Sequence, residues 1–276
     1  MTAAGKPRLL APAGACDCHM HVYDPRYRAT PSWPLVLPDA PLAAYRAVQA
    51  ALGLSRAVIV QPNGYGFDNA CTEEAVRGLG SAARGIATIP ADVADTELER
   101  LTRLGFRGAR CHMLKGGYLS WDDVDTIAAR VQPFGWHVQV QLDGRELPLR
   151  EAQLSRLPVD VVIDHNGKFL DPVPTSHPAF VVLQRRLDSG KFWVKLSAPY
   201  ETSKTGPPRY ADVSALARAL AAANPDRCLW ASNWPHPGTS PAPSTVAMLD
   251  LLLDWADDDA SRRKILVDNP ARLYGF

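Results

Sequence analysis

The sequence predicts an α/β fold, a closed (β/α)8 barrel of the TIM type, from three observations. Short apolar runs alternate with longer amphipathic stretches, and eight such runs can be counted. The length of 276 residues is close to the ~250 that one barrel domain commonly occupies. Because regular strand–helix alternation is typical of a parallel sheet, eight units predict closure into a barrel.

The predicted strands are apolar runs that end in polar, Gly or Pro residues. In chain order they span residues 14–22, 56–61, 85–90, 108–113, 137–142, 159–164, 192–197 and 228–232. Helical spacing of apolar residues predicts helices over residues 42–54, 72–79, 95–104, 121–131, 180–187 and 213–223. Gly105, Gly135 and Gly190 follow such helices, where a glycine in the left-handed conformation commonly ends a helix.

We expect a single domain over residues 1–276, with an N-terminal extension at 1–13 and two closing helices within 244–276. Two Pro-rich loops, residues 25–41 and 201–210, follow the first and seventh strands. In a barrel both loops would lie over the carboxyl ends of the strands, so we expect them to cover the active site.

The composition is that of a globular protein with a small-molecule partner. Hydrophobic residues make up 46% of the chain, and 30 Lys and Arg balance 29 Asp and Glu. Because no basic field results, we expect neither nucleic acid nor a membrane surface as a partner, while a homo-oligomer stays open. Since no run of 18 apolar residues and no signal-peptide pattern is visible, and five cysteines are scattered, we expect a cytoplasmic location with reduced thiols.

Polar residues gather where the predicted strands end, which is where such barrels carry their active sites. Residues two apart on a strand face the same side, so Asp17, His19 and His21 point together at the end of the first strand. A His-x-His pair can bind a metal or clamp an oxyanion. The alternative is that both histidines fill the barrel as hydrogen-bonded core residues.

Three motifs carry a family resemblance: CDCHMH at 16–21, VIDHNGKF at 162–169 and ASNWPHP at 231–237. Through them the chain resembles the amidohydrolase superfamily, in the amidohydrolase-related group of 2-pyrone-4,6-dicarboxylate lactonase and sugar lactonases. QLDG at 141–144 and APYETS at 198–203 make it most similar to the D-galactarolactone isomerases of that group. The resemblance covers the chain from about residue 14 to its end, and it implies an amidohydrolase-like barrel that acts on a small lactone.

Two departures from relatives bear on the substrate. The pyrone dicarboxylate lactonases are implied to bind two carboxylates through extra arginines, where this chain has Gly116, Lys168 and Glu201, so we disfavour that substrate. The isomerases lack the first histidine of the pair, which this chain keeps as His19. Whether His19 is essential therefore stays open.

The resemblance also implies a question about metal. Metal-dependent members bind zinc through the His-x-His pair, further histidines or a carboxylated lysine, and an aspartate that ends the eighth strand. Here that strand ends in Asn233, and a neutral amide is a poor zinc ligand that cannot take a proton from metal-bound water. We expect no cofactor; the alternative is zinc on His19, His21 and His165.

Without a metal, the lactone oxygen is expected to meet fixed hydrogen-bond donors. The predicted catalytic residues are His19, His21, Asp143, His165 and Asn233, with Asp143 or His165 as the base. The predicted substrate-binding residues are Asn63, Arg110, His112, Lys168, Tyr200 and His236. Arg110 and Lys168 would hold a carboxylate, although Arg110 could instead pair with Asp143 or Asp164. Tyr200 and His236 could instead only shape their loops.

The sequence thus predicts an enzyme of sugar-acid or aromatic catabolism that isomerises a small carboxylated lactone or hydrolyses it, without metal. Ring-size interconversion fits Asn233, because proximity of a substrate hydroxyl replaces much of what a base and an ordered water would supply. A zinc-dependent lactonase or decarboxylase is one alternative. A non-catalytic barrel that binds sugar acids is the other.

Overall fold

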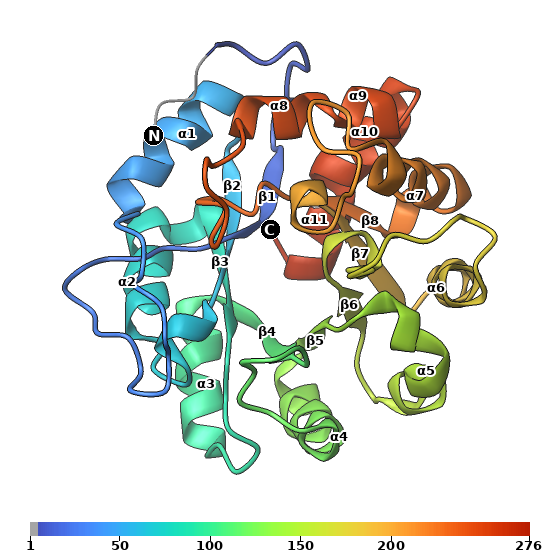
Figure 1. Cartoon of the computed structure of the whole chain (residues 1–276). Helices are drawn as coiled ribbons and strands as arrows, with labels where there is room; N and C mark the ends of the chain where they lie inside the picture. The colour runs from blue at the N-terminus through green and yellow to red at the C-terminus, as the bar shows by residue number, and fades with distance from the viewer. Residues whose placement is uncertain (1–4) are drawn as a thin grey trace.

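The computed structural model describes residues 5–276 and contains an eight-stranded parallel barrel surrounded by helices (Figure 1). The strands neighbour one another in chain order. They span Cys16–Met20 (β1), Arg56–Val60 (β2), Ala83–Ala87 (β3), Phe106–His112 (β4), His137–Gln141 (β5), Val161–Ile163 (β6), Phe192–Leu196 (β7) and Cys228–Trp230 (β8). The predicted fold class is confirmed.

β3 and β4 begin two residues earlier than predicted, at Ala83 and Phe106. Each early segment contains an arginine, so it interrupted the apolar run by which the strand was predicted. Arg84 donates to the carbonyl of Tyr274 and Arg107 to that of Thr102, so the two charged side chains bind backbone oxygens beside the barrel instead of disrupting it.

The barrel closes between the first strand and the segment after the last. The amide of Asn233 donates to the carbonyl of His19, and the amide of His21 donates to that of Trp234, both at 2.8 Å. Asp17 strengthens this seam, because its buried carboxylate accepts from the Ser232 amide at 2.9 Å and from the Ser232 hydroxyl. The aspartate of the first motif therefore joins the two ends of the sheet.

The helices that cover the sheet are α1 (Leu42–Leu52), α2 (Ala70–Leu79), α3 (Asp95–Leu104), α4 (Trp121–Val131), α5 (Leu147–Arg156), α6 (Pro178–Asp188) and α7 (Ala211–Ala223). Helix α5 was not expected, because it buries only Leu147 and Leu154 and so lacks a clear apolar stripe. Gly105, Gly135 and Gly190 all have positive φ, as predicted for residues that end helical segments.

The C-terminal part forms two helical arms, each interrupted. One arm consists of α8 (Thr245–Asp250) and α9 (Leu252–Trp255); the other consists of α10 (Asp259–Arg263), a π-helical turn (Lys264–Asp268) and α11 (Asn269–Tyr274). In the predicted N-terminal extension, residues 1–4 lie outside the described part, and the amides of Arg8 and Leu9 donate to Asp250.

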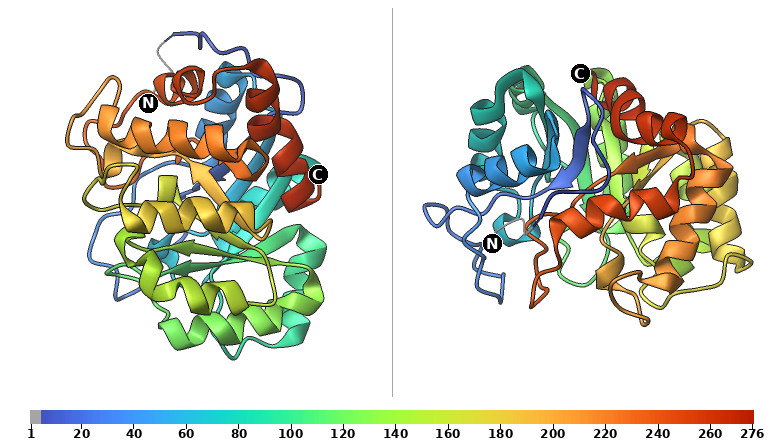
Figure 2. Two further views of the ribbon diagram at one scale, coloured as in Figure 1. Left: turned by 90° about the vertical axis from the view of Figure 1, so that its right-hand side faces the viewer. Right: turned by 90° about the horizontal axis from the view of Figure 1, so that it is seen from above.

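The chain's end blocks one mouth of the barrel. Tyr274 is fully buried against Cys16 and Cys18 of β1, and the C-terminus lies near the barrel axis (Figure 1). In Figure 2, right, the loop of residues 25–41 lies at the opposite end. The carboxyl ends of the strands are thus the open side. Over residues 5–276, no helix combines the length and apolar character needed to cross a membrane.

Candidate active site

A cavity of about 180 Å³ opens at the carboxyl ends of the strands. Six of the predicted site residues line it: His21, Asn63, Arg110, His112, His165 and Asn233. The lining also contains residues that were not predicted, namely Tyr23, Trp33, Leu35, Pro62, Gln141, Glu201, Pro237 and Gly238. Trp33 and Leu35 come from the loop of residues 25–41, which lies at the cavity as expected.

Five predicted residues do not line this cavity: His19, Asp143, Lys168, Tyr200 and His236. His19 is fully buried beside His21. The carboxylate of Asp143 instead accepts hydrogen bonds from Arg145, including one of 2.9 Å from its Nε, and from the amide of Leu170. Asp143 therefore caps the short turn Gly144–Glu146 that leads into α5, and it is not placed to take a proton from a substrate in the cavity.

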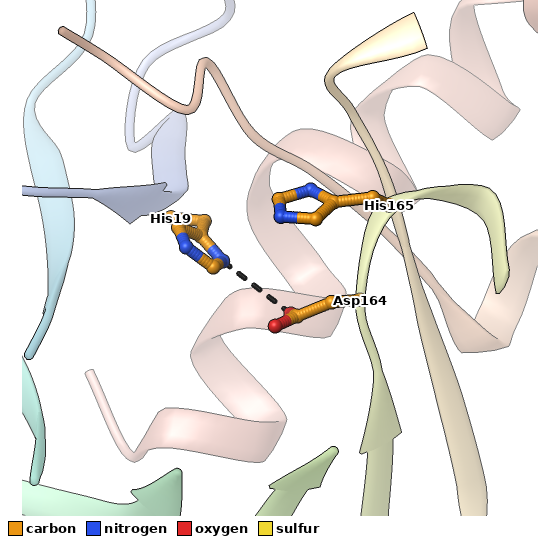
Figure 3. A group of neighbouring side chains, drawn as sticks. All are labelled: His19, Asp164 and His165. Carbon is orange, nitrogen blue, oxygen red and sulfur yellow. Dashed lines mark ion pairs between the residues drawn. The ribbon is translucent and has the colours of Figure 1, made fainter. Parts of the chain in front are cut away.

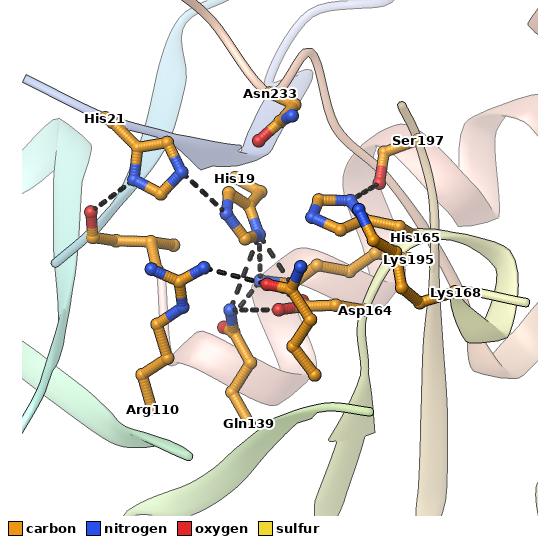
Figure 4. A network of polar contacts seen from close by, with 12 residues as sticks. His19, His21, Arg110, Gln139, Asp164, His165, Lys168, Lys195, Ser197 and Asn233 are labelled. Carbon is orange, nitrogen blue, oxygen red and sulfur yellow. Dashed lines mark hydrogen bonds and ion pairs between the residues drawn. The ribbon is translucent and has the colours of Figure 1, made fainter. Parts of the chain in front are cut away.

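His19 and His21 form a hydrogen-bonded pair whose direction the backbone fixes. Nδ1 of His21 lies 2.8 Å from the carbonyl oxygen of Val60, which can only accept. That nitrogen carries the proton of the neutral ring, so Nε2 of His21 is an acceptor. It lies 3.1 Å from Nε2 of His19, which must then be the donor (Figure 4).

Both rings are neutral at neutral pH. Burial, followed by the charge of Arg110, lowers the pKa of His21 to about 3. Burial and the ammonium of Lys195 hold the pKa of His19 well below its usual range, and burial does the same for the pKa of His165. A neutral imidazole donates from only one of its two nitrogens. Because His21 already donates to Val60, it cannot also be the oxyanion donor that the sequence suggested.

A second polar group lies deeper in the barrel, on the Nδ1 side of His19 (Figure 4). Nζ of Lys195 lies 2.5 Å from Oε1 of Gln139, 3.3 Å from Nδ1 of His19 and 3.6 Å from Oδ1 of Asp164. Burial alone would raise the pKa of Asp164, but the ammonium of Lys195 and the hydrogen bond from Gln139 bring it below the usual value, so the carboxylate is ionised. Gln139 donates to the other carboxylate oxygen at 3.1 Å.

Gln139 and Lys195 were not among the predicted site residues. Gln139 has a signal that could have revealed it, because it lies two residues before Gln141 on β5 and so faces the same side. Lys195 is the one charged residue in the apolar run FWVKL of β7. A charge inside a buried strand needs a partner, and such a residue is worth singling out.

The loop after β6 holds His165 in an uncommon backbone conformation. His165, Asn166 and Lys168 all have positive φ, which costs a non-glycine residue of order 1–3 kcal/mol. The loop also passes so close to the one after β5 that a Cβ on Gly144 would lie 2.4 Å from the carbonyl oxygen of Gly167. Nδ1 of His165 lies 2.8 Å from the hydroxyl of Ser197, the residue that follows β7, and this contact holds the imidazole ring in place.

Asn233 presents its amide oxygen, not its nitrogen, to the cavity. Its Nδ2 donates to the hydroxyl of Tyr200 and to Oε1 of Glu201, both at 2.8 Å. A carboxylate can only accept, so this contact fixes the amide orientation. Figure 4 shows the oxygen of Asn233 turned towards His19 and His21. The sequence-based role of Asn233 as an oxyanion donor is therefore replaced by that of an acceptor.

Tyr200, His236 and Lys168 support this arrangement from behind. The Tyr200 hydroxyl lies 3.0 Å from Nδ1 of His236, whose Nε2 lies 2.9 Å from the Thr245 hydroxyl. Lys168 forms an ion pair with Glu201, so its charge is neutralised. These residues orient Asn233 and Glu201, in agreement with the loop-shaping alternative for Tyr200 and His236.

Arg110 keeps an uncompensated charge at the cavity. Its Nη atoms donate to the carbonyl of Gln61 and to Oε1 of Gln141, both at 2.8 Å, and these acceptors are neutral. Within residues 5–276 it has no ion pair, which contradicts the alternative pairing with Asp143 or Asp164. Nε of Arg110 and Nδ1 of His112 are buried without a hydrogen-bond partner in the described part. This wall can therefore attract an anion in the cavity.

The buried cluster of His19, Asp164 and His165 could be considered for a metal ion (Figure 3). Asp164 approaches His19 on Nδ1, at 3.3 Å, whereas His21 faces Nε2. The two nitrogens point to opposite sides of the ring, so one ion cannot use both. Lys195 already supplies positive charge beside Nδ1. On the His21 side, Asn233 is a poor ligand, so the residues present do not fit a resident metal.

Comparisons with known proteins agree with the fold and the motifs. A D-galactarolactone isomerase of Agrobacterium fabrum is 36% identical over 273 residues, which cover 97% of this chain and 93% of that protein. A 2-pyrone-4,6-dicarboxylate hydrolase of Comamonas testosteroni is 34% identical over 98% of this chain and 92% of its own. A crystal structure of ATU3138 from Agrobacterium tumefaciens, without ligand, matches with a TM-score of 0.92 at 35% identity over 98% of both chains.

The family model of the amidohydrolases matches residues 16–276, which is nearly the whole chain. The match begins at the first residue of β1, includes the three motifs at the strand ends and runs to the final residue. Together with relatives above 30% identity over almost their full lengths, it shows that this chain belongs to the amidohydrolase family.

Proposed function

We propose that this enzyme interconverts the ring sizes of a lactone that carries one free carboxylate and several hydroxyls, an aldarolactone of the galactarolactone type, and that it needs no metal. The relatives named above act, by their names, as a lactone isomerase and a lactone hydrolase. The choice between these activities rests on the residues at the cavity.

The charges at the cavity support a single carboxylate. Arg110 is the one Lys or Arg in the lining formed by the described residues, and it bonds neutral acceptors. A second substrate carboxylate would meet Glu201, whose charge is balanced by Lys168. Glu201 and the amide oxygen of Asn233 are acceptors, which suit substrate hydroxyls. The arginine supplies planar, charge-assisted hydrogen bonds to the carboxylate.

The histidine pair suits attack by a hydroxyl of the substrate on its own lactone carbonyl. A substrate hydroxyl can replace the direct 3.1 Å contact between the two rings only if they move apart; it then accepts from Nε2 of His19 and donates to Nε2 of His21. His21 takes the proton as the new carbon–oxygen bond forms, and returns it to the former ring oxygen as the old bond breaks. His165, neutral and at the cavity, is the donor available to the carbonyl oxygen.

The observation that carries the proposal is Asn233 at the end of β8. A neutral amide does not take a proton from water, and the hydrogens of this one are already donated to Tyr200 and Glu201. An intramolecular hydroxyl needs less activation, because effective molarities of oriented groups reach about 10⁵–10⁸ M.

The test is a panel of aldarolactones, aldonolactones and pyrone carboxylates followed by NMR in water enriched in ¹⁸O. Isomerisation yields a lactone of different ring size without solvent oxygen, whereas hydrolysis places ¹⁸O in a carboxylate. We expect isomerisation of a monocarboxylate lactone, unchanged by chelator or added zinc. Solvent oxygen in the main product would reassign the chain to hydrolysis, and activity tied to stoichiometric zinc would restore the metal-dependent alternative. Binding without turnover would favour the non-catalytic barrel that binds sugar acids.

A further inference from the structure

Lys195 occupies an unusual place for a lysine. It is fully buried inside the barrel, and it does not line the cavity. Its Nζ contacts Oε1 of Gln139 and Nδ1 of His19, and Asp164 balances its charge from 3.6 Å. The chemistry proposed above gives no role to Lys195 or Asp164, so this buried ion pair needs its own explanation.

The contacts form a one-way chain of donors from Lys195 to the backbone. An ammonium has no lone pair, so Lys195 must donate to Nδ1 of His19. A neutral His19 then carries its proton on Nε2 and donates to His21, 3.1 Å away. His21 in turn carries its proton on Nδ1 and donates to the carbonyl of Val60. One end of the chain cannot accept and the other cannot donate, so only one direction is consistent.

Asp164 would impose the reverse direction if Lys195 were absent. Its Oδ1 lies 3.3 Å from Nδ1 of His19 and has no hydrogen-bond partner among the described residues. The amide of Gln139 also lies 3.4 Å from Nδ1, but it already donates to the other oxygen of Asp164, so the carboxylate attracts a proton onto Nδ1. His19 would then turn a lone pair towards the lone pair on Nε2 of His21, and the pair would lose its hydrogen bond.

We propose that Lys195, aligned by Gln139, is a positioning residue that fixes the tautomer of His19, so that His19 donates from Nε2 towards His21, the proton acceptor of the site. This inference deepens the proposed function and rests on it for its catalytic meaning. The tautomers themselves can be measured without a substrate.

The experiment is ¹⁵N NMR of the histidine rings at pH 7.5 in the full chain, assigned with His19→Gln and His21→Gln. In the unaltered protein we expect protonated Nε2 and bare Nδ1 in His19, with the reverse in His21. Lys195→Met should move the proton of His19 to Nδ1 and lower kcat at least 100-fold, with KM changed less than threefold. Lys195→Arg, which keeps a cationic donor, should retain the tautomers and recover part of kcat.

Lys191→Met is the matched control, because Lys191 lies just before β7 and its ammonium binds the carbonyls of Ser155 and Leu157. It should leave tautomers and kcat unchanged. If Lys195→Met does not fold, the double variant with Asp164→Asn removes both buried charges, and its amide should again donate to His19 and restore the original tautomer.

The proposal is overturned if Nε2 of His19 carries no proton in the unaltered protein. It is also overturned if Lys195→Met leaves the ring signals unchanged, or if the proton of His19 lies on Nδ1 in the double variant. These results are separable from failure of the proposed function. If no lactone is isomerised but the tautomers behave as described, the proposed function fails and the positioning role of Lys195 stands.

Discussion

At the scale of single residues, the site is defined by which atom each polar group turns towards the cavity. Asn233 supplies an oxygen because Tyr200 and Glu201 take its hydrogens, and His21 supplies a lone pair because Val60 takes its proton. Glu201 lines the cavity although Lys168 balances its charge. Residue identity alone would not have distinguished donors from acceptors here.

Glu201→Gln should broaden the substrate range to dicarboxylates. The amide keeps an oxygen for Lys168 but removes the charge, so Lys168 can attract a second carboxylate. A gain of about 1.4 kcal/mol corresponds to tenfold in affinity, and we expect at least that for a lactone with two carboxylates. Binding is measured by isothermal titration calorimetry. Glu151→Gln, which removes a carboxylate paired with Arg185 on the outer helices, is the control. Equal weak binding in both variants would contradict the assignment.

Asn233→Asp should raise hydrolysis relative to isomerisation, in a pH-dependent way. The new carboxylate would lie close to that of Glu201, where the amide nitrogen now lies 2.8 Å from Oε1. Two carboxylates at this distance share a proton, which raises the pKa of one of them. The single variant should therefore hydrolyse lactone mainly at alkaline pH, and the double variant with Glu201→Gln already at pH 7. A product ratio that stays at the original value in both variants, by NMR, would refute the role given to Asn233.

At the scale of elements, the loops after the strands are held by local capping groups. The loop after β7 is tied to the start of α7 by Asp212, which accepts from the amides of Lys204 and Val213 at 2.7 and 2.9 Å and from the Thr205 hydroxyl. Burial raises the pKa of Asp212, but a hydrogen bond from the Ser203 hydroxyl, together with those just named, outweighs burial and lowers the pKa to about 2. This loop carries Glu201 to the cavity, so its order matters to the site.

Asp212→Asn should lower the free energy of unfolding by roughly 1–2 kcal/mol. A folded-state pKa below the unfolded value of about 3.9 stabilises the protein above that pH, and the gain is lost as pH falls through 2. Between pH 6.5 and 8 the difference between variant and unaltered protein should therefore be constant. Urea titrations across this range measure it. A difference below about 0.5 kcal/mol, or one that grows with pH, would argue against this capping role.

At the scale of the whole molecule, the barrel encloses an unusual number of neutral imidazoles. Of the seven histidines in the chain, six are largely buried and have a lowered pKa, with burial as the main cause: His19, His21, His112, His137, His165 and His236. Each binds a proton more readily in the unfolded chain. Stability from these groups is complete above the unfolded pKa of about 6.5 and is lost as pH falls.

The protein should therefore unfold cooperatively near pH 5–5.5. Below pH 6.5, each histidine that is protonated only on unfolding lowers the free energy of unfolding by about 1.4 kcal/mol per pH unit, and six lower it by roughly 8 kcal/mol per pH unit. A typical total stability is about 5–15 kcal/mol. Circular dichroism against pH gives the midpoint, and the slope of unfolding free energy with pH gives the proton uptake, expected near six. His137→Phe, remote from the cavity, should reduce the uptake by one. A midpoint below pH 4 would show that burial of these rings is not what limits acid stability.

The alternation of strands and helices was predictable because it depends on local sequence, namely the spacing of apolar residues. Helix α5 was not, since its packing needs only Leu147 and Leu154. The three motifs likewise located His21, His165 and Asn233 at strand ends. Their neighbours Trp33 and Leu35 could not be placed, because a long loop without periodicity gives no indication of where it folds back.

What the sequence determined by itself is the order of the elements and the side chains that end each strand, since both follow from local pattern and from the period of a β-strand. What the tertiary structure alone decided is the direction of the hydrogen bonds at the site: Asn233 turned oxygen-first to the cavity, and Lys195 set behind His19. Those directions depend on partners from other strands, brought within about 3 Å only when the barrel closes, and no spacing along the chain encodes them.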